Sequence, residues 1–231
     1  MKIYTTKNHL GQDVAVQVQQ GSNNSKTGDG VQIWTLPLKW IVEGKQAMQD
    51  DSASCFDCIH SKNKNRTCYV RKGMSEMGLK SKVNSLHNQY TAGTLELVDI
   101  SQLAVNEVEN CRGKFVRFGA YGEPVLLGED NVRAISEVAS NFTGYTHQWF
   151  QPIFQWASKY FMASADTDKL MEKANRNGWR TFRVMTKGDT KLQSEVLCPA
   201  SKEGGRKVTC SECGLCKGKS VGAKSIAIYK H

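Results

Sequence analysis

Long hydrophobic runs are missing from this sequence. No apolar segment approaches the roughly 20 residues needed to span a bilayer, and the opening residues MKIYTTKNHLGQDVAV lack the apolar core of a secretory signal peptide. Both absences predict a cytoplasmic protein with no membrane partner. Thiols stay reduced in the cytoplasm, so the eight cysteines among the 231 residues predict metal binding and not a disulfide framework.

Four cysteines near the C-terminal end have the spacing of a metal-cluster ligand set. Three form a C-x2-C-x2-C run, and the fourth lies upstream, directly before a proline. The iron–sulfur run of bacterial ferredoxins has the same three and a fourth next to proline, although that fourth lies downstream. The spacing favours a 4Fe–4S cluster, with zinc as the alternative because C-x2-C is also a zinc knuckle. The predicted ligands are Cys198, Cys210, Cys213 and Cys216.

Cys55, Cys58 and Cys68 form a second group that we also predict to bind metal. Three thiolates leave one ligand unassigned. It could be His60, Cys111, a water or a substrate, or the two cysteine groups could share one site as in a zinc ribbon. A three-cysteine cluster with an open iron would be catalytic, whereas a site closed by His60 would be structural. Cys111 itself is expected to be an ordinary buried thiol.

Positive charge is concentrated in the two cysteine-bearing segments. The formal net charge is +9, and residues 55–82 and 198–231 each have seven basic against two acidic residues, which gives +5 for each segment. Cations beside a thiolate site lower its electrostatic cost, but a basic surface also binds phosphates. The basic residues are not interleaved with aromatic ones, which favours contact with a nucleic-acid backbone over base stacking. The candidates for nucleic-acid contact are Lys62, Lys64, Arg66, Arg71, Lys72, Lys202, Arg206, Lys207, Lys217 and Lys219.

Alternating strand and helix patterns predict an α/β fold. From residue 114 onward strand-like runs alternate with helical ones, so we expect parallel strands with right-handed crossovers. We predict a partial or irregular (β/α) barrel, with an open sheet as the second choice, in which metal stabilises the C-terminal segment. The expected parts are an N-terminal β-rich segment at 1–54, a cysteine-rich basic insert with a helix at 55–110, and the (β/α) core with the four-cysteine site at 111–231.

Reactive side chains follow the predicted strands. Because the carboxyl ends of parallel strands meet at one edge, these side chains should share a pocket. His147 could pair there with Glu123 or Asp166 as acid and base, so these three are candidate catalytic residues. The plainer interpretations are a helix N-cap for Asp166, a turn for Glu123 and a core position for His147. Candidate cofactor-binding residues at the same edge are Tyr121, Gln148 and Ser164.

Several short motifs occur in a fixed order over about residues 55–217. They are CFDC with a later CY, RFGAYGEP, TGYTHQW, MASADT, GWRTFRV, CPAS and CSECGLCKG. Together they resemble a family of uncharacterised proteins from bacteriophages and mobile elements. The resemblance implies a phage-type origin and a cysteine-bound metal in the host-cell cytoplasm, and it implies no particular reaction. A looser similarity is to radical SAM enzymes, which combine a (β/α) barrel with a three-cysteine cluster, but their C-x3-C-x2-C motif is absent.

These features support three hypotheses of different classes. The leading one is a cytoplasmic, phage-type metalloprotein that binds an iron–sulfur cluster and acts on, or regulates, nucleic acid or a nucleotide. The second is a zinc-stabilised nucleic-acid-binding protein without catalysis. The third is a factor that binds a host protein and uses metal only for structure. The sequence leaves open whether the protein is an enzyme.

Overall fold

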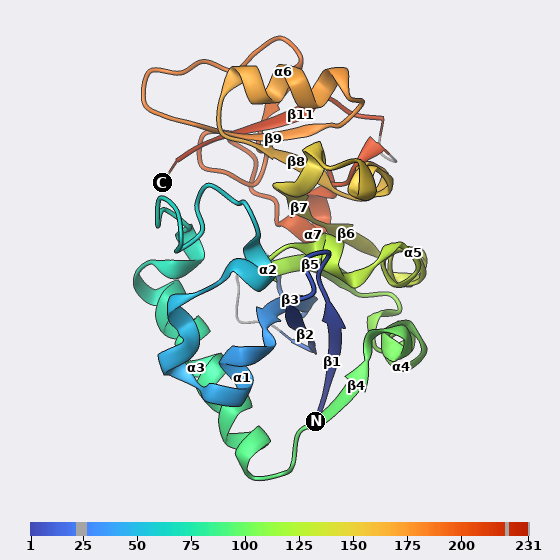
Figure 1. Ribbon diagram of the computed structural model, residues 1–231. Coiled ribbons are helices and arrows are strands. Elements are labelled where there is room, and N and C mark those ends of the chain that lie inside the picture. The colour runs from blue at the N-terminus through green and yellow to red at the C-terminus, as the bar shows by residue number, and fades with distance from the viewer. Residues whose placement is uncertain (22–26, 220–221, 231) are drawn as a thin grey trace.

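The protein has a mixed α/β fold with two sheets (Figure 1). The computed structural model describes residues 1–21, 27–219 and 222–230. In the first sheet the two N-terminal strands are antiparallel, and Gly11, with φ at 79°, lies in the turn between them. The order across this six-stranded sheet is β4 (Glu96–Asp99), β1 (Lys2–Lys7), β2 (Asp13–Gln19), β3 (Val31–Pro37), β5 (Phe115–Tyr121) and β6 (Asn141–Thr143).

The second sheet has five strands, and all of its pairings are parallel. This confirms the parallel arrangement that the alternating pattern predicts for the C-terminal half. The order is β10 (Glu195–Leu197), β11 (Ser225–Tyr229), β9 (Thr181–Met185), β8 (Met162–Ala165) and β7 (Tyr145–Thr146).

Gly144 is the single residue between β6 and β7, so the chain passes there directly from one sheet to the other. Within the described ranges β4 and β10 each pair with one strand only, and no pairing closes the two sheets into a ring. The α/β class is confirmed, whereas a partial barrel stays a prediction.

Seven α-helices of the described chain cover the sheets. In Figure 1, α1 and α3 lie together beside the first sheet, α4 and α5 lie together on another side of it, and α6 packs on the second sheet. They are α1 (Leu38–Glu43), α2 (Ser52–Cys55), α3 (Gly73–Thr91), α4 (Leu103–Cys111), α5 (Glu129–Val138), α6 (Asp168–Arg176) and α7 (Cys210–Cys213). The segment Pro152–Lys159 is a 3-10 helix. Within the described ranges, every helix is too short or too polar to cross a bilayer.

Two apolar clusters fill the space between helices and sheets. One contains Phe118 and Phe161 together with residues of α4 and α5, and the other contains Trp40 and the buried stripe of α3. Each burial of a large side chain contributes about 1.5–3 kcal/mol. Cys111 is fully buried in the first cluster, and burial raises its pKa to about 12. The prediction of an ordinary buried thiol is confirmed.

The start of α6 differs from the N-cap expected at Asp166. Thr167 is the capping residue, because it is extended (φ −147°) and its side chain accepts a hydrogen bond from the backbone of Leu170. Threonine satisfies the same unpaired N–H groups that an aspartate would. The plainer interpretation of Asp166 is therefore wrong, and its carboxylate faces other partners.

A buried ion pair connects the strands of the second sheet. Arg183 of β9 donates to both carboxylate oxygens of Glu195 on β10, at 2.8 and 2.6 Å. The two side chains are 4% and 0% exposed. Buried charges of this kind are tolerated only when both partners are present.

Replacing Arg183 by methionine should therefore destabilise the protein by about 3–5 kcal/mol, because Glu195 is left charged and unpaired in the core. Denaturant unfolding of the variant measures this loss. The matched control is Arg133→Met, which breaks the exposed ion pair with Asp130 and should change stability by at most about 1 kcal/mol. Equal effects of the two substitutions would contradict the importance of the buried pair.

Candidate functional site

The loop that contains the first three cysteines is organised by the buried carboxylate of Asp51. Its oxygens accept hydrogen bonds from the hydroxyl of Ser61 at 2.6 Å and from the backbone N–H of Lys62 at 3.0 Å. The hydroxyl of Tyr121 donates to the same carboxylate at 3.2 Å. A buried carboxylate needs such donors, and here they fix the start of the loop against the end of β5.

Cys55, Cys58 and Cys68 lie near one another. Cys55 is buried at the end of α2, and the other two are half-buried. Burial raises the pKa of Cys55 and of Cys68, and the negative charge of Cys58 contributes to both shifts. The three thiols predicted to bind metal are thus close enough to interact electrostatically.

His147 connects this cysteine group to Glu123. Its Nδ1 lies 3.5 Å from the sulfur of Cys58 and 3.4 Å from Oε1 of Glu123. Glu123 is 5% exposed and accepts from the hydroxyl of Thr146 at 2.6 Å and the backbone of His147 at 3.1 Å. Burial lowers the pKa of His147, but hydrogen bonds to Cys58 and Glu123 outweigh it and raise the pKa well above the ordinary value. The predicted acid/base partners are brought together.

His60 and Asp166 complete the same region. His60 Nε2 lies 2.7 Å from Asp166 Oδ1, and His60 Nδ1 lies 2.6 Å from the hydroxyl of Thr67. The rings of His60 and His147 are 5.6 Å apart. Burial raises the pKa of Asp166, but the hydrogen bond from His60 and the charges of both histidines lower it overall.

We name this region the carboxyl-edge site, because its side chains follow the ends of β5, β7 and β8. Sequence reasoning considered His60 only as a ligand of the cysteine group and missed its pairing with Asp166. The site comprises Cys55, Cys58, His60, Cys68, Glu123, His147 and Asp166.

The four C-terminal cysteines converge at a second location. Burial raises the pKa of Cys216 to about 12, a hydrogen bond with Tyr145 opposes the shift, and the charges of the other three cysteines add to it. Cys210 and Cys213 are the first and last residues of α7, and Thr209 and Glu212 close a capping box at its start. We call Cys198, Cys210, Cys213 and Cys216 the four-cysteine group.

Arginine and asparagine side chains hold the loop around the four-cysteine group. Arg180, directly before β9, donates to several carbonyls of this loop, including that of Leu215 at 2.9 Å, and Asn141 donates to the carbonyl of Ser211 at 2.9 Å. Arg117 of β5 donates to the hydroxyl of Tyr69. Burial lowers the pKa of Arg117, but nearby groups including Tyr69 and Cys210 raise it overall. Arg117 therefore lies between the two cysteine-bearing segments.

Among the described residues, neither cysteine group has its thiols as close together as the ligands of a single zinc ion. A zinc–thiolate bond of about 2.3 Å places the sulfurs of a tetrahedral site about 3.8 Å apart. In the described part of the chain, the one group of three or more Cys, His, Asp or Glu side chains whose ligand atoms all lie within 4.8 Å of one another is His60, His147 and Asp166.

The three candidate cofactor-binding residues have different surroundings. Tyr121 is buried and hydrogen-bonded to Asp51 and Arg71. Gln148 is also buried, and its Nε2 has no hydrogen-bond partner in the structure. Ser164 lies in β8, and its carbonyl accepts from the indole of Trp149 at 3.1 Å. Tyr121 also lies beside Cys55 of the carboxyl-edge site, with which it shares a hydrogen bond.

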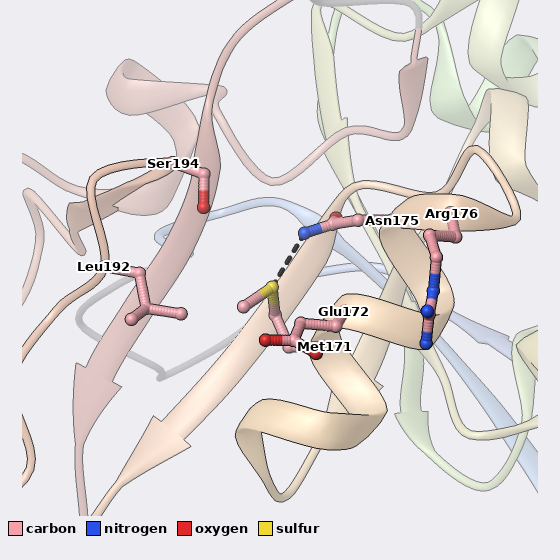
Figure 2. A pocket seen from close by; sticks show the side chains of 6 residues that line it. All are labelled: Met171, Glu172, Asn175, Arg176, Leu192 and Ser194. Carbon is pink, nitrogen blue, oxygen red and sulfur yellow. Dashed lines mark hydrogen bonds between the residues drawn. The ribbon is translucent and has the colours of Figure 1, made fainter.

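Two surface pockets lie away from both the carboxyl-edge site and the four-cysteine group. One of about 370 Å³ lies between α6 and the segment before β10 (Figure 2), and within it Asn175 Nδ2 contacts Met171 Sδ at 2.7 Å. Another of about 330 Å³ lies beside α1. No cysteine or histidine lines either one, so we place the candidate site where the reactive side chains converge. The first pocket is lined by Met171, Glu172, Asn175, Arg176, Leu192 and Ser194.

The ten basic residues predicted to contact nucleic acid divide by burial. Arg71 packs over the ring of Trp40 at 5.2 Å and donates to the carbonyl of Met48 at 2.8 Å, so it serves the fold. Lys217 lies over the ring of Phe142, and Lys62 is also half-buried. The exposed members are Lys64, Arg66, Lys72, Lys202, Arg206, Lys207 and Lys219.

Comparison with known proteins adds no relative. The sequence matches no family model, and neither the curated proteins nor the solved structures contain a significant match. The resemblance to bacteriophage proteins stays a prediction from the sequence motifs.

Replacing Glu123 by glutamine should lower the pKa of His147, because the carboxylate that stabilises the imidazolium is removed while the shape is retained. The NMR titration of the His147 ring in metal-free protein measures the change. In the parent protein the raised pKa means that protonated His147 stabilises the fold at low pH, and that this stabilisation is lost as pH rises through the folded-state pKa. Glu129→Gln, on the exposed surface of α5, is the control, and an unchanged His147 pKa in both variants would contradict the assignment.

Proposed function

We propose that the protein is a cytoplasmic metalloprotein of the bacteriophage type that binds iron–sulfur clusters and acts on, or regulates, nucleic acid or a nucleotide. The main support is the convergence of four cysteines from separated stretches of sequence, Cys198 on one side and Cys210, Cys213 and Cys216 on the other. Four thiolates in one small volume would repel one another, so metal-free protein keeps Cys216 protonated, and a bound cation is what would allow all four to ionise. A bound metal centre would explain why the fold brings these four cysteines together.

The charges around the four-cysteine group suit a cluster. A cluster bound by four thiolates is anionic, and neighbouring cations and hydrogen bonds stabilise it and set its potential. Arg117 is close to Cys210, and Arg180 holds the backbone on both sides of Cys216. Residues Cys198, Cys210, Cys213 and Cys216 would hold the group, which when bound supplies one-electron chemistry or structural support.

The carboxyl-edge site is the proposed location of chemistry. We propose that the fold is a partial (β/α) barrel. The residues Glu123, His147 and Asp166 follow the ends of its parallel strands β5, β7 and β8. His147, whose pKa is raised by Cys58 and Glu123, can donate a proton, and Glu123 orients it. Cys55, Cys58 and Cys68 would hold a second metal group beside this acid.

A zinc-stabilised nucleic-acid-binding protein is the second candidate. The observation in its favour is the local geometry after α7, where Gly214 adopts a left-handed conformation (φ 60°) between Cys213 and Cys216. A tight turn between two cysteines that are separated by two residues is typical of zinc knuckles. We favour the cluster because the C-x2-C-x2-C run with a fourth cysteine beside a proline matches the ligand spacing of ferredoxin-type clusters.

Protein purified without oxygen should be brown and contain iron and acid-labile sulfide. Cys210→Ser combined with Cys213→Ser should remove the iron of the four-cysteine group and leave the iron of the other centre, because two of its four thiolates are lost. Metal and sulfide analysis measures both. Cys111→Ala, which removes a core cysteine outside both groups, should leave the iron content unchanged. Colourless protein with stoichiometric zinc would instead support the second candidate.

Nucleic-acid binding should weaken steeply with salt. Each phosphate contact contributes about −0.9 to the slope of log K against log salt on duplex DNA, so Arg206→Gln with Lys207→Gln should reduce the slope by about 2. Fluorescence anisotropy with a labelled duplex at several salt concentrations measures this. Lys39→Gln with Lys114→Gln, two exposed lysines outside the cysteine-bearing segments, should leave the slope unchanged. Binding that is absent or insensitive to salt would exclude the basic surface.

A further inference from the structure

We propose that His60, His147 and Asp166 bind one divalent metal ion of the manganese or ferrous class, in a mononuclear site separate from the thiolate centres. The three side chains come from the loop between Cys58 and Cys68, from the residue after β7 and from the residue after β8. One ligand atom of each lies within 4.8 Å of the others. Two imidazoles and one carboxylate with open positions are the ligand set of non-haem ferrous sites.

Both histidines have the outer hydrogen-bond partners that metal ligands require. A ligating histidine usually has its second ring nitrogen on an oxygen, which fixes the ring and its tautomer. The Nδ1 of His60 lies 2.6 Å from Thr67 Oγ1. The Nδ1 of His147 lies 3.5 Å from Cys58 Sγ and 3.4 Å from Glu123 Oε1, so it faces a sulfur and a carboxylate oxygen. The Nε2 atoms can then bind the ion, and that of His60 already faces Asp166. A ligating imidazole must be neutral, so the metal-bound and the proton-donating forms of His147 are alternative states of the site.

Asp166 is not occupied by a structural role that would remove it from the site. The cap of α6 is Thr167, one residue later. The ion pair that Asp166 makes is with His60, at 2.7 Å. Two ligand atoms that each lie about 2.1 Å from an ion, at a right angle to each other, are about 3.0 Å apart. The distance between His60 Nε2 and Asp166 Oδ1 therefore has to increase by only a few tenths of an ångström to admit an ion.

Solvent can reach the site while its support remains buried. The side chains of His60, His147 and Asp166 are 32%, 25% and 21% exposed, whereas that of Glu123 is 5% exposed. An ion can therefore enter, and the orienting carboxylate stays fixed. Imidazole and carboxylate donors suit divalent ions, including manganese and ferrous iron, whereas iron–sulfur clusters are bound by thiolates. This difference makes the site testable independently of the cysteine groups.

The test is a titration of the full-length protein with Mn²⁺, in which the electron paramagnetic resonance signal reports the unbound ion. Wild type should bind one equivalent at this site. His60→Ala and the isosteric Asp166→Asn should each weaken the dissociation constant by at least about tenfold, and Thr67→Ala, which removes an outer partner, by about 10–100-fold. His9→Ala, which removes an exposed histidine outside the site, should bind like wild type.

The outcomes separate this site from the proposed clusters. The Cys210→Ser, Cys213→Ser variant should keep its manganese site even though it loses iron, because the ligands are different. No binding by wild type, or equal dissociation constants for wild type, His60→Ala and Asp166→Asn, would overturn the proposal. Circular dichroism confirms that each variant is folded, and Asp166→Asn alone decides if His60→Ala is not.

Discussion

The carboxylate of Glu123 is the interaction on which the candidate site depends. Its side chain accepts from Thr146, the last residue of β7 in the second sheet, and from His147, the next residue. Its backbone N–H donates to the carbonyl of Ser54 in α2 at 2.8 Å. One residue thus connects both sheets and the first cysteine segment. The preceding Gly122 has φ at 74°, and an added Cβ would lie 2.3 Å from the carbonyl oxygen of Thr35. Only glycine fits this approach, so the position of Glu123 is fixed by the backbone.

The sequence predicts local elements better than the path between them. The strand and helix patterns after residue 114 and the parallel pairing of the C-terminal strands agree with the structure, because they depend on the periodicity of apolar residues. The change of sheet at Gly144 is invisible to such patterns. It depends on a tertiary contact, since an added Cβ would lie 2.4 Å from the ring of Phe161. The cap of α6 is displaced by one residue from Asp166 to Thr167, because both residue types satisfy helix N–H groups equally well.

The candidate site was predictable to the extent that its members are close in sequence. Spacing alone grouped Cys210, Cys213 and Cys216, and the position of His147 after a strand suggested its pairing with Glu123, which the structure shows. The contact between His60 and Asp166 spans 106 residues. No local pattern signals it, since His60 lies in a loop whose course is set by hydrogen bonds to Asp51. Long-range pairs of single polar residues require the fold to be known.

The excess of positive charge has two physical roles that burial separates. The half-buried arginines hold the cysteine-bearing segments in place. Arg71 donates to the hydroxyl of Tyr121 near the first cysteine loop, and Arg117 lies beside Tyr69 and Cys210. Their charges are needed near thiolates in a medium where Coulomb interactions are strong. Side chains such as Arg206 and Lys207 are exposed, and their like charges repel one another. The proposed contact with nucleic acid therefore concerns the exposed basic residues and not the buried ones.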